Sequence, residues 1–332
     1  MNSTHPAVSL SRGNRLAVLL DRLWHASPPL TAVGTLMLLA AIASLIGIFV
    51  DPRIITGAPA WLKPFKFAVS TAIYSLTLAW VFEWLSDWPR VRRVVGWTTA
   101  IVFVLEVAII DVQAWRGTTS HFNVSTPLNA TLFFVMGGAI LLQTFVSVAV
   151  LVTLWRQRFV DKPLGWALRL GMTVTIAGAL TGPLMTRPTP AQLAEAHRNG
   201  RITIAGAHTV GGTDGGPGAP LTGWSTRHGD LRIPHFIGLH GLQVLALIAV
   251  GLGYWRRPEA VRVKAMFAAA ASYVSLFLLL LWEAMRGQSV MALDAKALAP
   301  IAIWAAVTAV ALFWISFGAR KTSRDRLDRM TV

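Results

Sequence analysis

The sequence predicts an all-α integral membrane protein with eight transmembrane helices, arranged as two parallel four-helix repeats. Three observations support this fold class: an apolar composition, an internal repeat, and the placement of the basic residues. Of the 332 residues, 54% are hydrophobic and only 14% are charged, which is too apolar for a soluble chain of this length. Most of the chain is therefore expected to lie in a lipid bilayer, which is its predicted partner.

Eight segments are apolar and long enough to cross a bilayer, which takes roughly 20 residues. The predicted spans are residues 30–50, 65–85, 94–115, 128–155, 164–185, 233–255, 262–285 and 298–317. The predicted regions are a cytoplasmic N-terminal segment (1–29), a first four-helix repeat (30–155), a cytoplasmic linker (156–163), a second repeat (164–317) containing a long outer loop (186–232), and a basic cytoplasmic tail (318–332).

The second half of the chain repeats the first at an offset of 170 residues. Pro64 recurs as Pro234, and the run QAWRG at 113–117 recurs as EAMRG at 283–287. Because each repeat has an even number of helices, both copies cross the membrane in the same sense, about a pseudo-twofold axis along the membrane normal. Duplicated bundles usually place their site between the halves, where the copies have diverged.

The net charge of +15 does not form one soluble patch, as a nucleic-acid surface would require. Basic residues instead follow every second span, for example Arg90, Arg92 and Arg93 after the second. This pattern predicts an inner membrane protein of the bacterial type with both termini in the cytoplasm. The chain has no cysteine, which excludes c-type haem attachment, iron–sulfur clusters and disulfides.

The connection 186–232 is the only long one, and the charge pattern puts it outside the cytoplasm. Its first part, RPTPAQLAEAHRNGR, begins with proline and is rich in helix formers, so it predicts a short surface helix. Its second part contains GGTDGGPG, where closely spaced glycine and proline residues predict turns. We expect this loop to fold as a cap over the outer mouth of the bundle.

Unusual polar residues gather at the outer ends of the predicted helices, which predicts an outward-facing pocket. The alternative is that they only face water at the membrane interface. His240 and Gln243 share one face of the sixth predicted helix, whereas His235 points about 140° away from His240. HxxxxH is therefore a weak metal motif. His240 is either a core histidine bonded to a neighbouring helix, or an axial haem ligand, metal ligand or proton acceptor.

His121 and His208 approach from outer connections and are expected to complete a site with His235 or His240. Imidazoles suit haem iron, copper or zinc alike, so their spacing does not choose among these metals. The alternative role for both histidines is to stabilise loops and turns. No cofactor follows from the sequence alone, and haem b is one that this site would suit.

Arg116 and Arg286 occupy equivalent repeat positions at outer helix C-termini, where the helix dipole favours a cation. They either stabilise these helix ends or clamp an anion as a pseudo-symmetric pair. Glu106 is the deepest carboxyl group and shares a helix face with Gln113. An ionisable group at that depth is a candidate catalytic or proton-coupling residue, with hydrogen-bonded packing as the alternative.

These features leave three functions open. The first is haem binding or redox chemistry, because two four-helix halves with outer histidines resemble, in topology only, haem-binding membrane proteins such as the haem A synthases. Those proteins use histidines on paired helices in both halves, whereas the fourth and eighth helices here have none. The second is a transporter or sensor for a small anionic or amphiphilic ligand. An assembly role with membrane partner proteins and no chemistry is a third reading.

Overall fold

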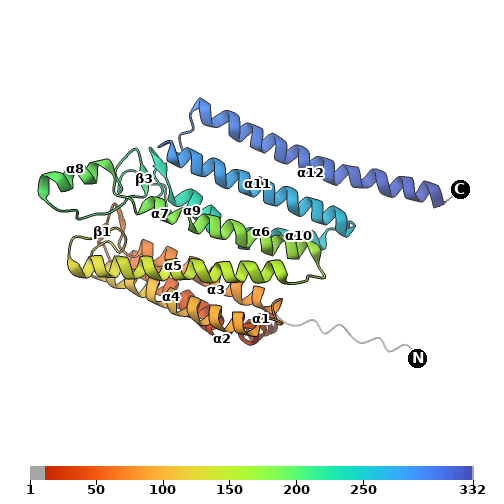
Figure 1. Ribbon diagram of the computed structural model, residues 1–332, viewed down its shortest axis with the longest axis horizontal. Helices are drawn as coiled ribbons and strands as arrows, with labels where there is room; N and C mark the ends of the chain where they lie inside the picture. Colours follow the sequence, from red (N-terminus) through yellow and green to blue (C-terminus); the bar gives the residue numbers. More distant parts are fainter. Residues whose placement is uncertain (1–11, 331–332) are drawn as a thin grey trace.

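The long helices lie side by side in one elongated bundle (Figure 1). The computed structural model describes the backbone of residues 12–330 and the side chains of residues 15–317. The basic side chains of the predicted C-terminal tail lie outside the described residues. At one end of the bundle lie α8, β1 and β3, and at the other lie α1 and the last turns of α12 (Figure 1). We call the first of these the capped end.

Twelve helices and four short strands make up the described part of the chain. In the first half, the helices are α1 (Arg12–Ala26), α2 (Pro28–Val50), α3 (Leu62–Glu83), α4 (Pro89–Trp115) and α5 (Pro127–Arg156). In the second, they are α6 (Lys162–Ala179), α7 (Gly182–Met185), α8 (Pro190–Asn199), α9 (Arg232–Leu239), α10 (Gly241–Tyr254), α11 (Glu259–Met285) and α12 (Ala295–Met330). The strands pair as two antiparallel hairpins, β1 (Ile54–Ile55) with β2 (Ala58–Pro59) and β3 (Thr209–Val210) with β4 (Gly229–Asp230).

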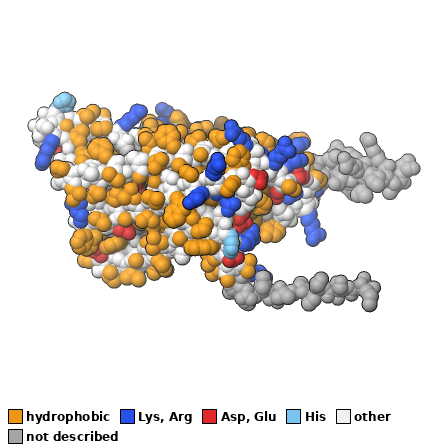
Figure 2. All heavy atoms as spheres, turned by 60° about the horizontal axis from the view of Figure 1, so that its bottom comes forward, with side chains coloured by type: hydrophobic (Ala, Val, Ile, Leu, Met, Phe, Trp, Pro, Cys, Tyr) orange, Lys and Arg blue, Asp and Glu red, His pale blue; other side chains and the backbone are white. Residues whose placement is uncertain are grey.

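The helices are those of a multi-pass membrane protein. Seven of them are long and apolar enough to cross a bilayer, or eight spans if α9 and α10 are counted as one bent span. Figure 2 shows hydrophobic side chains over much of the visible face, with many Lys and Arg side chains toward the α1 end. The sides of the bundle therefore suit lipid.

Local sequence signals set the helix ends. Pro28, Pro89 and Pro127 each stand in the first turn of a helix, where the missing N–H has no helical partner to lose. Helices α4 and α11 both have 27 residues, and their first and last residues are 170 positions apart. Each helix is followed by an arginine at the C-cap and then by a glycine with positive φ, Gly117 (φ 73°) or Gly287 (φ 75°), which terminates the helix.

The predicted sixth helix is wrong in one respect, because it is broken at His240 into α9 and α10, which meet at 46°. His240 and Gln243 therefore do not lie on one face of a regular helix. Side chains from neighbouring helices bind the groups freed by the break. The Tyr273 hydroxyl donates to Ile237 O at 2.6 Å, and Thr175 Oγ1 donates to Leu239 O at 3.2 Å.

Helices α6 and α9 pack with their backbones in close contact next to this break. A Cβ atom on Gly178 would lie 2.4 Å from the Gly238 carbonyl carbon, so only glycine fits there. Close approach through small residues is typical of helix pairs in membranes. In the first half, α2 packs extensively against α3, as α6 does against α10 in the second.

The N-terminal segment is more structured than predicted. It forms α1, which packs against α2 and α3 through the buried side chains of Leu23 and Ala26. Arg22 of this helix forms an ion pair with Glu83 at the end of α3, with 2.5 Å between the charged atoms. Several apolar side chains of α1, including Leu19 and Trp24, are exposed.

The segment 186–232 folds over the capped end and contacts both halves of the bundle. The predicted surface helix is confirmed as α8, which begins with a capping box between Thr189 and Gln192. Val124 N donates to Thr203 O at 3.0 Å, which joins the segment to the first half. Ser289 Oγ donates to Ser225 O at 3.0 Å, which joins it to the second. We call this segment the cap.

Candidate ligand-binding site

Polar side chains from both halves and from the cap meet at the capped end. Lys63 comes from the first turn of α3, Glu106 from α4, and His235 from α9. His121 comes from the connection between α4 and α5. We call this group the capped site, and with the two residues that the cap adds it consists of Lys63, Glu106, His121, His208, Asp214 and His235.

Glu106 is buried, with 4% of its surface exposed, and it faces His121. Its Oε1 lies 3.6 Å from His121 Nε2, and its Oε2 accepts no hydrogen bond from any described residue. The other ring nitrogen of His121, Nδ1, lies 3.2 Å from Ser120 Oγ. The Glu106 carboxyl group therefore retains an acceptor that is free for a proton or a ligand donor.

His208 and Asp214 bind each other within the cap. The Asp214 carboxylate accepts from His208 Nδ1 at 2.9 Å and from the backbone N–H groups of His208 and Thr209 at 2.9–3.1 Å. Burial raises the pKa of Asp214, but the hydrogen bonds and charge of His208 outweigh it and lower the pKa well below its usual range. Asp214 thus holds His208 in place as an ionised carboxylate.

His235 is oriented by α6. Its Nδ1 lies 2.8 Å from Gly178 O and 3.0 Å from Thr181 Oγ1. Because a carbonyl oxygen only accepts, Nδ1 carries the proton, and the neutral ring presents an unprotonated Nε2. The carboxylate of Asp214 imposes the same tautomer on neutral His208. Two imidazoles therefore present free Nε2 lone pairs.

The three histidines of the site lie close enough to influence each other electrostatically. Burial lowers the pKa of His121 well below 6.5, and the charges of Lys63, His208 and His235 lower it further. Burial also lowers the pKa of His208, against the opposing effect of Asp214. The rings of His121 and His208 also both pack against Phe122, at 6.1 and 4.8 Å between ring centres.

Lys63 has an aromatic neighbour but no polar partner. Its ammonium group lies 5.7 Å from the centre of the Phe67 ring and makes no hydrogen bond or ion pair with any described residue. Glu106 and Asp214 attract it from a distance, whereas Lys66 and Arg232 repel it. Its three N–H donors remain available.

Lys66 and Arg232 form hydrogen bonds with cap residues beside this site. Lys66 Nζ donates to Thr222 O at 2.7 Å. Arg232 forms a bidentate pair with the buried carboxylate of Asp230, at 2.6 and 2.9 Å, and donates to Gly223 O at 2.6 Å. The charge of Arg232 is therefore balanced locally, while Lys66 keeps two free donors.

Several predicted site residues lie elsewhere in local structure. Arg116 donates to the side chains of Gln113 and Asn129, at 2.5 and 3.0 Å. Arg286 pairs with Glu283 at 3.1 Å and Asp294 at 2.5 Å, and stacks on Trp282. Both arginines and Gln113 thus stabilise connections within their own halves.

His240 is not joined to the other histidines by any hydrogen bond or charge interaction among the described residues. It contacts Ser70 and packs against the Phe236 ring, 4.3 Å between ring centres. Gln243, three residues further along the chain, is buried. Within the described residues, no group of three or more His, Asp or Glu side chains is placed to hold a metal ion.

Two residues of the capped site were missed by sequence reasoning, Lys63 and Asp214. Lys63 stands in a short connection that carries few charges, so the charge pattern did not single it out. A lysine just before the proline that opens an apolar helix was the available signal. Asp214 lies in GGTDGGPG, where the glycine pattern predicted turns or a backbone nest for an anion, and no role for the aspartate itself.

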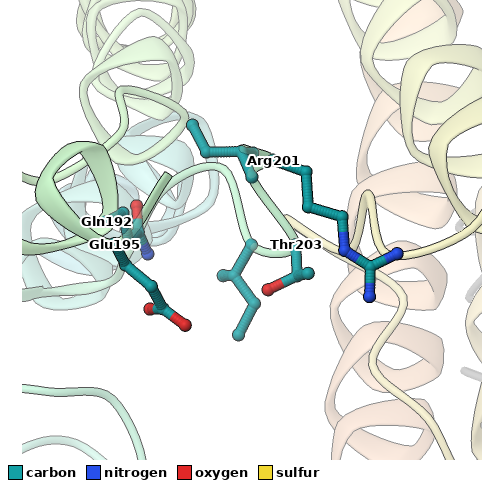
Figure 3. A pocket seen from close by; sticks show the side chains of 6 residues that line it. Gln192, Glu195, Arg201 and Thr203 are labelled. Atoms are coloured by element: carbon teal, nitrogen blue, oxygen red, sulfur yellow. The ribbon is translucent and has the colours of Figure 1, made fainter. Parts of the chain in front are cut away.

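A hollow of about 120 Å³ opens elsewhere in the cap, between α8 and residues 201–204 (Figure 3). Gln192 and Glu195 line one side, and Arg201 and Thr203 line the other (Figure 3). Gln192 is already bonded within its capping box and to Gly206. None of the six capped-site residues lines this hollow.

No protein-family model, curated protein or solved structure matches the chain. The site must therefore be interpreted from its own chemistry.

Proposed function

We propose that this multi-pass membrane protein binds a small organic anion at the capped site, as a transporter or sensor would. The observation that carries the proposal is the unpaired ammonium group of Lys63 beneath the cap. A half-buried cation without a partner is unfavourable, and an anionic ligand would compensate it. Lys66, with two free donors, adds positive charge from the same helix.

Among the described residues, no carboxylate pairs directly with Lys63, although Glu106 and Asp214 attract its charge from a distance. Asp214 is bound by His208 and two backbone N–H groups, and Asp230 is bound by Arg232. Of these three carboxylates, Glu106 alone has a free oxygen, and its other oxygen lies 3.6 Å from His121 Nε2. Glu106 and His121 together form a pair that can take up or release a proton on ligand binding.

Aromatic rings give the site an apolar side. His121 lies between Phe67, 5.6 Å between ring centres, and Phe122, at 6.1 Å. Phe122 also packs against the His208 ring at 4.8 Å. An anion with an apolar body would place its charge at Lys63 and its carbon atoms against these rings.

Binding of simple anions to the detergent-purified full chain tests this proposal. Calorimetric titrations with phosphate, acetate and benzoate are expected to detect at least one ligand, with benzoate preferred. Lys63→Gln should weaken binding about tenfold or more, which corresponds to about 1.4 kcal/mol. Lys296→Gln is the matched control, because Lys296 is exposed and begins α12 at the same end. Equal affinities in both variants and the wild type, or no binding near about 10 mM, would overturn the proposal.

A second candidate function is haem b or transition-metal binding with redox chemistry. It is favoured by the free Nε2 atoms of His208 and His235, whose Nδ1–H groups are oriented by oxygen acceptors, as metal-ligating histidines usually are. An absorption spectrum of the purified protein separates the two functions. A Soret band that disappears in His235→Ala would establish this second function, and a colourless protein that binds anions would exclude it.

A further inference from the structure

A stripe of polar side chains runs along one face of α3 and leads from the capped site into the bundle. Lys63, Lys66, Ser70 and Tyr74 follow each other at intervals of three or four residues, the spacing of one helix face. Lys63 and Lys66 belong to the capped end, whereas Ser70 and Tyr74 lie within the membrane-spanning part. Hydrophobic residues would be expected at such positions if α3 only packed against its neighbours.

Other helices contribute polar groups at each level of this stripe. Ser70 Oγ lies 3.5 Å from His240 Nε2, at the break between α9 and α10. One turn deeper, the Tyr74 hydroxyl lies 3.2 Å from Ser147 Oγ of α5. Gln143 Nε2, one turn from Ser147 on α5, lies 3.4 Å from the same Ser147 oxygen. These polar contacts with helices of both halves therefore form a row at two successive levels of α3, that of Ser70 and that of Tyr74.

The row passes well into the bundle. Tyr74 and Ser147 each lie nine residues before the last residue of their helices, which end opposite the cap. This separation is about 13 Å along the helix axis. Ser70 lies thirteen residues before the end of α3, or about 20 Å. The row thus continues from the capped end past the level of the α9–α10 break.

Two buried glutamine side chains, Gln143 on α5 and Gln243 on α10, have polar atoms without hydrogen-bond partners among the described residues. Gln143 is 7% exposed and Gln243 is 8% exposed. Gln143 Oε1 and both polar atoms of Gln243 make no hydrogen bond with any described residue. An unsatisfied buried amide group costs about 1–3 kcal/mol, so water molecules that bind several of these groups would be stabilising.

We propose that this row is a narrow water-filled path that leads from the capped site along α3 to Ser147. Such a path would carry water and protons between the capped end and the interior of the bundle. The proposal does not depend on which ligand the capped site binds.

Silver ions test this path, because they react with thiols and pass through narrow water-filled spaces. The chain has no cysteine, so single cysteines can be placed in the natural sequence. We expect Ser70→Cys and Ser147→Cys, in lipid nanodiscs, to react about tenfold or more faster than the control Ser75→Cys. Ser75 is at the depth of Tyr74 on another face of α3, fully buried toward α2. The thiol remaining after timed exposure is measured by maleimide labelling of the denatured protein.

A double variant decides from which end the silver arrives. Ser70→Leu in the Ser147→Cys protein should slow the reaction toward the rate of the control, because the path is interrupted above Ser147. The path is overturned if Ser147→Cys reacts as slowly as Ser75→Cys, or if Ser70→Leu leaves its rate unchanged. Size-exclusion chromatography shows that each variant remains folded. Neither result affects the Lys63→Gln binding experiment, so the two proposals fail separately.

Discussion

Ser70 and His240, which stand 170 positions apart, contact each other: Ser70 Oγ lies 3.5 Å from His240 Nε2. The predicted repeat has the same offset of 170 residues. An axis relating the two predicted repeats would therefore be expected to pass near this contact, between α3 and the α9–α10 break.

The first prediction is geometric. We expect α3–α5 to superpose on α9–α12 in chain order, by a rotation near 180° about an axis along the bundle, with Arg116 falling on Arg286. The equal lengths and ends of α4 and α11 are the physical reason. An experimental structure in lipid provides the measurement. A rotation far from 180°, or arginines that do not superpose, would mean that the sequence offset is a coincidence.

The second prediction is the orientation in the membrane. Reporter fusions after Arg92, Arg158 and Arg257 should behave as cytoplasmic, because these connections carry the excess of basic residues. A reporter inserted within 211–218 should behave as external. Alkaline phosphatase and fluorescent-protein reporters, which are active on opposite sides, check each other. The reverse pattern at even two of these sites would contradict the orientation.

The third prediction is that acid loosens the cap. The pKa values of His121 and His208 are lowered below 6.5, so the open cap takes up protons that the closed cap resists. The stability of the closed cap is therefore complete above about pH 6.5 and falls as the pH drops below it. The lowered pKa of Asp214 adds a further loss below its usual value of 3.8.

Hydrogen exchange at the backbone amides of His208 and Thr209 measures this effect, because the Asp214 carboxylate protects both in the closed cap. After correction for intrinsic rates, protection should be lower at pH 5.5 than at pH 7.5. His208→Phe should reduce the difference by removing one titrating group. Equal protection at both pH values in the wild type would contradict the prediction.

The fourth prediction concerns the contact between α6 and α9. Gly178→Ala should destabilise the protein by about 1–3 kcal/mol, because its Cβ would lie 2.4 Å from the Gly238 backbone. Gly137→Ala on α5 is the control, since no atom lies within 4 Å of a Cβ there. Thermal unfolding in detergent, followed by circular dichroism, should show a lower midpoint for Gly178→Ala alone. Similar midpoints for both variants would show that the helices separate without cost.

The sequence by itself determined the features that depend on neighbouring residues. Apolar runs and basic connections identified a multi-pass membrane protein, because the cost of placing polar groups in lipid acts on each segment separately. The proline start and the helix-forming residues of RPTPAQLAEAHRNGR predicted α8. These are local effects of backbone geometry, and they are readable without the fold.

Only the tertiary structure decided what forms the site. Lys63, Glu106, His121 and His208 are far apart in the chain, and their meeting depends on how α3, α4 and the cap pack. The break at His240 likewise depends on Thr175 and Tyr273 from other helices, which bind its freed backbone groups. The physical reason is that a buried polar side chain acquires its role from whichever partner packing brings to it, and no spacing along the chain records that partner.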